Sequence, residues 1–466
     1  MLELTPKLDI QSVEPLYLQL YNYIREEIES GTLLPHAKLP SKRKFAQHLK
    51  ISQNTIETAY DQLVAEGYID ALPRKGYFVS ELDHQRLDKS ITRKIPYVEE
   101  KPYRDQGYSF DFTQTGVDAR SFPFERYRNL LNKVIRSNNE EVLMLGHPQG
   151  EFKLRQEITN YIYESRGVQC SPSQIVIGAG THYLIQLLFQ LLPISTFAVE
   201  NPGYHRTLVQ SKKGQENVEM IPLEEDGMNV SLLKESKANI VFVTPSHQFP
   251  CGMTMPISKR MQLLNWAESK DGRYIIEDDY DSEFRYSSKP IPALQGLDHN
   301  EKVIYMSTFS KAFLPSLRIS YMVLPEPLIK KYQKDFFFYT QTVSRLGQET
   351  LIRFMQEGFW EKHIHKMRVI YHKKRDVLVS VSSTHFPNTI EIIGQDSGLH
   401  ILIRTNNGMT EQELIDEASK YRIKVYPVSG YGQSDNKTVL LGFAVLTEEE
   451  IKEAVRLLAK AWFPKE

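Results

Sequence analysis

The chain has 466 residues, of which 41 % are hydrophobic and 25 % charged, the balance of an ordinary globular protein with room for two or more domains. Its formal net charge of −1 excludes a global positive field, so any surface for nucleic acid must be local. Two cysteines exclude a disulfide framework and give no metal-binding spacing. Because the N-terminal residues also lack a signal-peptide pattern, we expect a cytoplasmic protein. The apolar run 183–194 is too short to span a bilayer.

The N-terminal part of the chain predicts three helices. In residues 15–30 apolar side chains recur at every fourth position, the pattern of a helix with one buried face. Ser41 is placed to begin a second helix over 42–49, and Ser52 to begin a third over 53–66, because serine is a preferred N-cap residue. Two helices joined by three or four residues, the second capped by serine, are typical of a helix-turn-helix.

A short hairpin with a basic turn follows the third helix, as in a winged helix. Its strands are expected near 68–71 and 77–79. Between His36 and Gln53 the chain holds several lysine and arginine residues and no acid, and basic residues bind phosphates. The polar start of the third helix can reach base edges in a major groove. The residues predicted to bind DNA are Lys42, Arg43, Ser52, Gln53, Asn54, Thr55, Tyr60, Arg74, Lys75 and Gly76. The alternative is a small helical interaction module whose basic residues are only solvated.

A solvated linker is expected over 83–107, because this stretch has few apolar residues, alternating charges and two prolines. A folded element hidden there is the alternative. From residue 108 onward, strands and helices alternate, which predicts a doubly wound α/β layout with its sites at the carboxyl ends of the strands. A smaller C-terminal part follows from about residue 346, and its last helix begins at the capping box Thr447-x-x-Glu450. The predicted domains are 1–82 and 108–466, with 83–107 between them.

Lys311 is the first candidate for chemistry in the large unit. It lies in the turn Ser307-Thr308-Phe309-Ser310-Lys311, after the apolar strand 303–306. A lysine beside small hydroxyl residues at the end of a strand can form a Schiff base with an aldehyde cofactor. The hydroxyls and Arg318 would bind the phosphate of that cofactor. A solvated loop lysine is the plainer interpretation of this turn alone.

An acidic segment upstream favours the cofactor interpretation. The strand 274–276 leads into Glu277-Asp278-Asp279-Tyr280, and Asp278 and Tyr280 lie on the same face of an extended chain. Pyridoxal phosphate needs a carboxylate at its pyridine nitrogen and benefits from a phenol at its ring oxygen. These two side chains can supply both groups.

Two further segments add to this pattern. Tyr204 ends Glu200-Asn201-Pro202-Gly203-Tyr204 and could stack on the cofactor ring. Gly180 and Thr181 open an apolar helix after the strand 174–177, and a small-residue turn at a helix N-terminus can hold a phosphate. The predicted cofactor residues are Lys311, Asp278, Tyr280, Tyr204, Gly180, Thr181, Thr308, Ser310 and Arg318.

In this order the segments resemble the fold-type I pyridoxal phosphate enzymes of the aspartate aminotransferase family, over roughly residues 108–466. The resemblance implies that Lys311 is the Schiff-base lysine, Asp278 the partner of the pyridine nitrogen and Tyr280 the partner of the ring oxygen. It also implies that Tyr204 is the stacking aromatic. It assigns the phosphate shell to Thr181, Thr308, Ser310 and Arg318.

The N-terminal pattern resembles the winged helix of the GntR family, through Leu39-Pro40-Ser41-x-Arg43 and Ser52-x-Asn54-Thr55. A GntR winged helix followed by an aminotransferase-like domain is similar to the MocR family, also called the GabR type. That resemblance implies a pyridoxal phosphate-dependent transcription regulator that binds operator DNA. It implies a head-to-tail homodimer, and as effector a small amino compound or the cofactor itself.

Three positions depart from the related patterns. Gln53 stands where the GntR family often has arginine, which leaves the base preference open. Phe249 of Phe249-Pro250-Cys251-Gly252 replaces the asparagine of the Asn-Pro-x-Gly segment of the enzymes. Gly430 stands where members that sense GABA have an arginine, so GABA is not the expected effector. Arg206 and Arg404 are the alternative carboxylate-binding residues, although both could be surface ion pairs.

Two other functions therefore remain open at this stage. A working aminotransferase with a DNA-binding appendage would show steady-state transamination, whereas a regulator would not. A cofactor-free scaffold would be colourless, since a Schiff base of this cofactor absorbs visible light. Phe249, the missing arginine and the winged helix favour the regulator.

Overall fold

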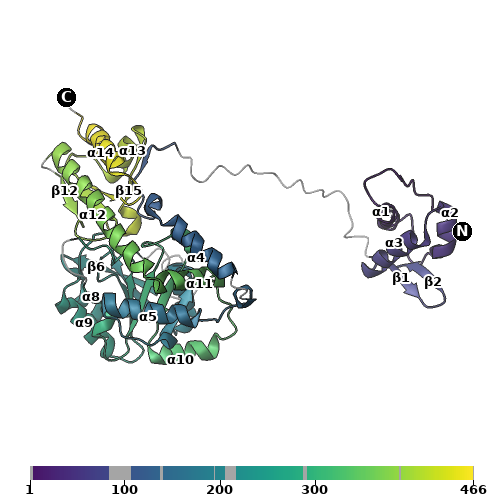
Figure 1. The fold of residues 1–466 in the computed structure, drawn as a ribbon, viewed down its shortest axis with the longest axis horizontal. Coiled ribbons are helices and arrows are strands. Elements are labelled where there is room, and N and C mark those ends of the chain that lie inside the picture. The colour runs from purple at the N-terminus through teal and green to yellow at the C-terminus, as the bar shows by residue number, and fades with distance from the viewer. Residues whose placement is uncertain are drawn as a thin grey trace. The chain divides into compact units, whose positions relative to one another are not determined.

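The computed structural model describes residues 4–82, 107–136, 140–193, 195–204, 217–286, 291–387 and 390–464 (Figure 1). The chain divides into two compact units, Met1–Pro102 and Tyr103–Glu466. The linker expected over 83–107 falls outside the described residues except for its last position, and so does the helix expected near 205–213. In the described ranges, none of the helices combines the length and apolar character that crossing a bilayer requires.

The first unit is a three-helix bundle with a hairpin. Its helices are α1 (Leu16–Glu29), α2 (Lys42–Leu49) and α3 (Gln53–Ala65), and its strands are β1 (Ile69–Leu72) and β2 (Gly76–Val79). Ser41 and Ser52 cap α2 and α3 by accepting hydrogen bonds from Lys44 N and Thr55 N, as expected for N-cap serines. The strands are antiparallel, and Ile69 pairs with Val79. The three helices and the hairpin of the sequence interpretation are therefore confirmed.

The second unit is built on an eight-stranded sheet with the order β4-β11-β10-β9-β8-β5-β6-β7. The strands β4, β10, β9, β8, β5 and β6 run parallel, and β11 and β7 run against them. The strands are β4 (Ile175–Gly178), β5 (Thr196–Asn201), β6 (Asn217–Glu224), β7 (Gly227–Met228), β8 (Ile240–Val243), β9 (Tyr274–Asp279), β10 (Val303–Thr308) and β11 (Ser320–Val323). The central strands are buried on both faces, which explains why they read as continuous apolar runs.

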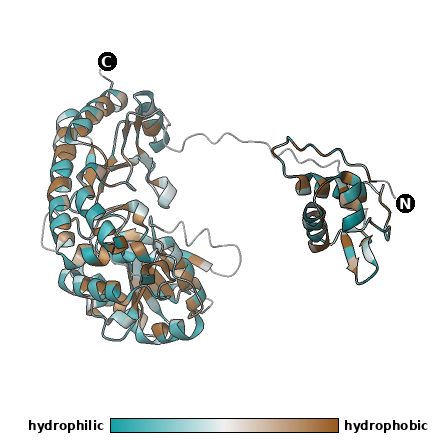
Figure 2. Cartoon of the chain, turned by 45° about the vertical axis from the view of Figure 1, so that its right-hand side comes forward, coloured by the Kyte–Doolittle hydropathy of each residue, from teal (hydrophilic) through white to brown (hydrophobic). Residues whose placement is uncertain are grey.

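Helices cover both faces of this sheet. Ile304 and Met306 of β10 pack in one hydrophobic cluster with α6 and α10, whereas Val303 packs in another with α8 and α9. Tyr305 belongs to a third cluster, which includes α5, α11 and α12. In Figure 2 the brown, hydrophobic residues gather on the sheet and on the helix faces turned toward it. The helices are α4 (Phe124–Arg136), α5 (Phe152–Arg166), α6 (Thr181–Leu191), α8 (Val230–Glu235), α9 (Ile257–Glu268), α10 (Glu326–Asp335), α11 (Arg345–Gln356) and α12 (Phe359–His385).

The C-terminal part forms its own layer of strands and helices. Its sheet has the order β12-β13-β16-β15, from Glu391–Ile393, His400–Arg404, Thr438–Gly442 and Tyr426–Pro427. A second small pairing joins β14 (Ile423–Lys424) to β3 (Phe110–Asp111) in parallel. The helices α13 (Glu411–Lys420) and α14 (Glu448–Trp462) pack beside these strands. The capping box predicted for α14 is present, because Glu450 N donates to Thr447 Oγ1 at 3.1 Å and Thr447 N donates to Glu450 Oε2 at 2.6 Å.

A short hydrogen-bonded contact joins the segment after β9 to this C-terminal part. Gly398 N donates to Phe284 O at 2.7 Å, and Tyr286 N donates to Asp396 O at 3.0 Å. The Tyr286 hydroxyl donates to Gly398 O at 2.7 Å. The acidic segment that begins at Asp278 is therefore attached at its far end to the chain that leads into β13.

Candidate functional site

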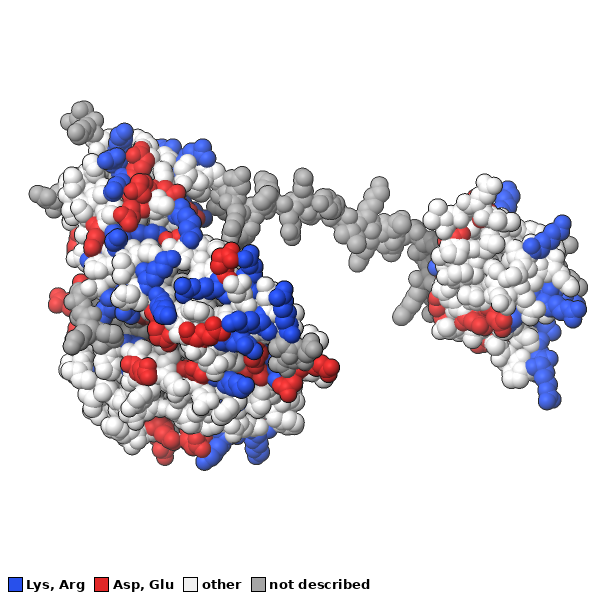
Figure 3. All heavy atoms as spheres, viewed as in Figure 1, with Lys and Arg blue, Asp and Glu red and all other residues white. Residues whose placement is uncertain are grey.

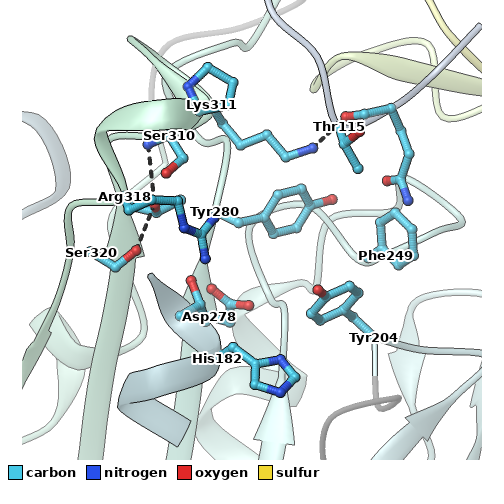
Figure 4. Close-up of a pocket in the computed structure, with 14 residues that line it drawn as sticks. Thr115, His182, Tyr204, Phe249, Asp278, Tyr280, Ser310, Lys311, Arg318 and Ser320 are labelled. Carbon is cyan, nitrogen blue, oxygen red and sulfur yellow. Dashed lines mark hydrogen bonds between the residues drawn. The ribbon is translucent and has the colours of Figure 1, made fainter. Parts of the chain in front are cut away.

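A cavity of about 260 Å³ lies at the edge of the eight-stranded sheet where its parallel strands end (Figure 4). Asp278 comes from the end of β9, Thr308 from the end of β10 and Ser320 from the start of the antiparallel β11, so three neighbouring strands meet there. The other lining residues are Gln114, Thr115, Thr181, His182, Tyr204, Phe249, Tyr280, Ser310, Lys311, Pro315 and Arg318. Every predicted cofactor residue except Gly180 lines this one cavity.

Lys311 reaches the cavity from the turn after β10. Figure 4 shows Lys311 and Asp278 approaching the same space from opposite sides, with Tyr280 between them. Lys311 Nζ donates to Gln114 O at 2.5 Å. Enclosure by protein lowers the pKa of Lys311 below its ordinary value, although Asp281 and Asp278 act in the opposite direction. A lysine with a lowered pKa has a larger neutral, nucleophilic fraction at neutral pH.

Asp278 is a buried acid of the site, and one of its carboxylate oxygens lacks a hydrogen-bond partner among the described residues. Its side chain is 4 % exposed, and its Oδ1 has no hydrogen-bond partner among the described residues. Burial raises its pKa to about 7, with Asp279 and Asp281 adding to the effect and Lys311 opposing it. The neighbouring Asp279 is satisfied, since it accepts from Tyr305 Oη at 2.7 Å and from Arg166 Nε at 2.7 Å. Of these two neighbouring acids, Asp278 is the one whose carboxylate lines the cavity.

The part of the cavity wall around Arg318 suits an anion. Gly180 has a φ of 93°, and a Cβ there would overlap the Arg318 guanidinium, so only glycine lets the arginine lie against this turn. Ser320 Oγ donates to Thr308 Oγ1 at 2.8 Å, and Ser310 N donates to the same oxygen at 3.1 Å. Within the described part of the chain, Ser310 Oγ is buried without a partner. Helix α6 begins beside this group, at Thr181, and its first N–H groups favour negative charge.

Aromatic side chains form the remaining wall. The Phe249 ring lies 5.7 Å from the Tyr204 ring, 6.1 Å from the Tyr280 ring and 4.7 Å from the Tyr431 ring, in edge-on arrangements. Phe249 is 3 % exposed and has no side-chain donor. The Tyr280 hydroxyl is 2.9 Å from His247 Nδ1. Tyr280 and Tyr204 therefore supply the hydroxyl groups of this wall, and Phe249 supplies none.

Several lining residues were not predicted from the sequence. Gln114 and Thr115 come from the segment before α4, and Gln114 Nε2 donates to Tyr431 Oη at 2.7 Å. His182, Pro315 and Ser320 complete the wall. No local pattern marks Gln114, because 197 positions separate it from Lys311, the residue it contacts. Ser320 could have been found from its place at the start of a strand beside the Lys311 turn.

Of the two predicted carboxylate-binding arginines, only Arg404 lies among the described residues. Arg404 pairs with Glu391 through Nη1 at 2.6 Å and with Asp435 through Nε at 2.5 Å, and it does not line the cavity. Its guanidinium is thus already engaged by two carboxylates, as in the surface-pair alternative. Arg206 lies outside the described residues.

The first unit presents most of the predicted DNA-binding residues at its surface. Ser52, Gln53, Asn54 and Thr55 cap and begin α3, and Arg43 is exposed on α2. Figure 3 shows lysine and arginine side chains gathered on one side of this unit. The tip of the hairpin contains Arg74, Lys75 and Gly76, with Arg74 at a φ of 62° and Gly76 at 107°.

Two residues of this set are engaged within the unit. Tyr60 is 0 % exposed and its hydroxyl donates to Pro40 O at 3.0 Å, so the prediction that it contacts DNA is wrong. It lies on the inward face of α3, where its ring packs edge-on against Tyr77. Lys42 Nζ is 2.6 Å from Glu57 Oε1, so its charge is partly neutralised before any phosphate approaches.

Comparison with known proteins agrees with this division. Residues 16–79 match the family of bacterial regulatory proteins of the gntR type, and residues 116–458 match the class I and II aminotransferases. A solved structure of Pyrococcus horikoshii kynurenine aminotransferase, in complex with PMP, superposes with a TM-score of 0.67 at 25 % identity. The match covers 76 % of this chain and 90 % of that enzyme, which confirms the predicted fold-type I aminotransferase fold of the second unit.

Full-length relatives carry both units. The HTH-type transcriptional regulator YdeL of Bacillus subtilis (strain 168), itself uncharacterised, is 43 % identical over 99 % of this chain and 100 % of its own length. The probable rhizopine catabolism regulatory protein MocR of Rhizobium meliloti is 30 % identical over 98 % of this chain and 96 % of its own. The chain therefore belongs to the MocR-type HTH transcriptional regulators, which join a gntR-family DNA-binding domain to an aminotransferase domain.

Proposed function

We propose that the aminotransferase-like unit holds pyridoxal 5′-phosphate and that operator binding by the first unit responds to a small amino compound or to the cofactor itself. The observation that carries this proposal is the cavity at the sheet edge. It brings together a partly buried lysine, a buried carboxylate with an oxygen that has no partner among the described residues, and an arginine seated against a glycine turn.

The residues present fit this cofactor at three points. Lys311 would bond its aldehyde carbon, and Asp278 would face its ring nitrogen, whose positive charge would give Oδ1 the partner that it lacks among the described residues. Arg318, Thr308 and Ser310 would bind its phosphate together with the first N–H groups of α6. When bound, pyridoxal phosphate supplies a carbonyl carbon that reacts with amines and a ring that accepts electrons. Tyr204 and Phe249 would keep water from the ring by their apolar surfaces.

The wall around Phe249 supports a sensor rather than an efficient enzyme. The aminotransferases that this unit resembles place an asparagine donor there, whereas Phe249 packs among three tyrosine rings. Tyr280 alone would then hold the ring oxygen. An effector carboxylate could still be bound by Arg206. Steady-state transamination over a panel of amino acids tests the enzyme alternative, since typical enzymes turn over about 1 to 1000 times per second.

The proposed regulator acts as a homodimer in the cytoplasm, the compartment that holds its DNA. The consecutive residues Leu143, Met144 and Leu145 are 86 %, 67 % and 80 % exposed, an apolar run that favours a subunit interface. Two winged helices would then read two half-sites. By resemblance to the family we expect a head-to-tail dimer and half-sites in direct repeat.

Fluorescence anisotropy with the DNA upstream of its own gene tests this proposal. The full-length protein is titrated with and without bound pyridoxal phosphate, and then with a panel of amines and amino acids. We expect at least one compound to change the apparent Kd for the full operator but not for scrambled DNA. Binding that is equal for operator and scrambled DNA, or a protein that takes up no pyridoxal phosphate, would contradict the proposal.

A further inference from the structure

His247 is a buried residue behind the cavity whose contacts define the chemistry of Tyr280. Its Nδ1 is 2.9 Å from Asp281 Oδ1, 3.0 Å from Asp281 Oδ2 and 2.9 Å from the Tyr280 hydroxyl. The ring is 2 % exposed, and its Nε2 has no partner among the described residues. A single ring nitrogen therefore faces both a carboxylate and a phenol.

The position of the imidazole ring is fixed from two sides. A Cβ at Gly398 would overlap the His247 ring, so the chain leading into β13 lies directly against it. On another side the His400 ring lies 5.3 Å away, and His400 Nε2 is 3.0 Å from Pro250 O. Because neighbours enclose the ring, turning it to exchange its two nitrogens would require these segments to move.

The contacts determine which nitrogen carries the proton. A carboxylate only accepts hydrogen bonds, so the nitrogen that faces Asp281 must be the one that bears a hydrogen. Asp281 therefore keeps a hydrogen on Nδ1. That nitrogen has no lone pair left to accept from Tyr280.

We infer that His247 is a positioning residue that makes Tyr280 a hydrogen-bond donor into the cavity. Since Nδ1–H can only donate, the Tyr280 oxygen can only share this hydrogen as a second acceptor beside Asp281, and the phenolic proton points away from His247. Asp281 holds this arrangement by fixing the tautomer. The inference rests on the proposed cofactor, because the group that would receive the proton is the ring oxygen of pyridoxal phosphate.

The inference also explains which side chain replaces the asparagine donor of the enzymes. Phe249 offers no hydrogen there, and Tyr280, whose ring lies 6.1 Å from the Phe249 ring, takes over as the donor to the ring oxygen. A tyrosine that could rotate its proton toward a histidine lone pair would be an unreliable donor. The His247–Asp281 pair prevents this rotation, because the lone pair on Nδ1 is replaced by a hydrogen. We therefore expect the site to prefer ligands whose ring carries an oxygen acceptor.

Ligand discrimination tests this directly. The probes are pyridoxal 5′-phosphate and 3-deoxypyridoxal 5′-phosphate, which differ only in the ring hydroxyl, and the apparent Kd of each is measured by tryptophan fluorescence with the full-length protein. We expect His247→Phe and Tyr280→Phe each to reduce the preference for pyridoxal phosphate by about tenfold or more, as for a hydrogen bond to a charged acceptor. The double variant should lose no more than either single variant. His247→Asn, which keeps a donor near the Nδ1 position, should retain most of the preference.

His365→Phe is the matched control, because His365 is exposed on α12, outside the cavity. It should keep the preference of the original protein. If His247→Phe does not fold, His247→Leu takes its place. An unchanged preference in the His247 variants, or additive losses in the double variant, would overturn the inference while leaving the proposed cofactor intact. Failure of the unaltered protein to bind either probe would instead refute the proposed function.

Discussion

Replacing Asp278 by asparagine should change stability and cofactor binding in opposite directions. The buried carboxylate has a pKa of about 7 in the cofactor-free protein, against an ordinary value of 3.8. An aspartate whose pKa is raised on folding stabilises the folded state fully only below its ordinary pKa. This contribution is lost as the pH rises toward the raised value, so the stability of the cofactor-free protein should fall between about pH 4 and pH 7.

The pKa difference sets the size of the effect. Each pKa unit corresponds to about 1.36 kcal/mol, so the charged carboxylate costs at most about 4 kcal/mol at pH 8. Asp278→Asn removes that charge but leaves a buried polar group, and a gain of about 1 to 3 kcal/mol in the free energy of unfolding is expected. The same change removes the negative partner of the ring nitrogen. The affinity for pyridoxal phosphate should then fall by about 10-fold to 100-fold. This loss corresponds to the free-energy contribution of one hydrogen bond to a charged group.

Urea unfolding of the cofactor-free protein at pH 5 and pH 8 measures the predicted change in the free energy of unfolding. Trp266, Trp360 and Trp462 are buried in the second unit, so their fluorescence reports its unfolding. Asp118→Asn is the control. Burial raises the pKa of Asp118, but Lys374, at 3.0 Å, Ser121 and Arg120 together hold it below its ordinary value. That variant should lose stability at pH 8 and keep its cofactor affinity. If Asp278→Asn also destabilised the cofactor-free protein at pH 8, our account of Asp278 as an unsatisfied charge would be wrong.

Three further predictions concern single contacts. Lys311→Ala should lose covalent attachment of pyridoxal phosphate, measured by mass spectrometry after borohydride reduction, and attachment retained by the variant would move the role to another lysine. Lys75→Ala should weaken operator and random DNA about equally and lower the salt slope by about one, whereas Asn54→Ala should cost about 1–3 kcal/mol on the operator and little on random DNA. Anisotropy at two salt concentrations separates these outcomes, and equal losses for both variants would contradict them. Tyr60→Phe leaves Pro40 O unpaired and should cost about 0.5–1.5 kcal/mol in the unfolding of the first unit without affecting the salt slope.

Local patterns were sufficient for much of the fold and for one side of the candidate site. The N-cap serines Ser41 and Ser52 and the capping box at Thr447 are local signals, and the helices they predict are present. The cavity segments could be found because each follows an apolar strand, and strands of a parallel sheet end at one edge. Lys311 and Asp278 were therefore expected to meet although 33 positions separate them in the sequence.

The misses share a physical cause, which is tertiary packing. Gln114 reaches Lys311 from the start of the second unit, and no periodicity in its own segment indicates that contact. Tyr60 was assigned to DNA from its place on the recognition helix, but a helix has an inward face, and Tyr60 lies on it. Arg404 could be recognised as a possible anion partner, yet Glu391 and Asp435, which engage it, lie 13 and 31 positions away.

The hydrogen bonds between the segment after β9 and the chain before β13 couple the pocket energetically to the C-terminal sheet. Only three residues lie between Tyr280, at the pocket, and Phe284, which makes the first of the three hydrogen bonds to Gly398 and Asp396. If the C-terminal sheet shifts, it must either carry the acidic segment with it or break these bonds, at about 1 kcal/mol each. The resulting total of about 3 kcal/mol is comparable to the 1–3 kcal/mol by which one ligand typically controls the binding of another at a distant site. A ligand that displaces the end of β9 must therefore either shift the C-terminal sheet or break these hydrogen bonds.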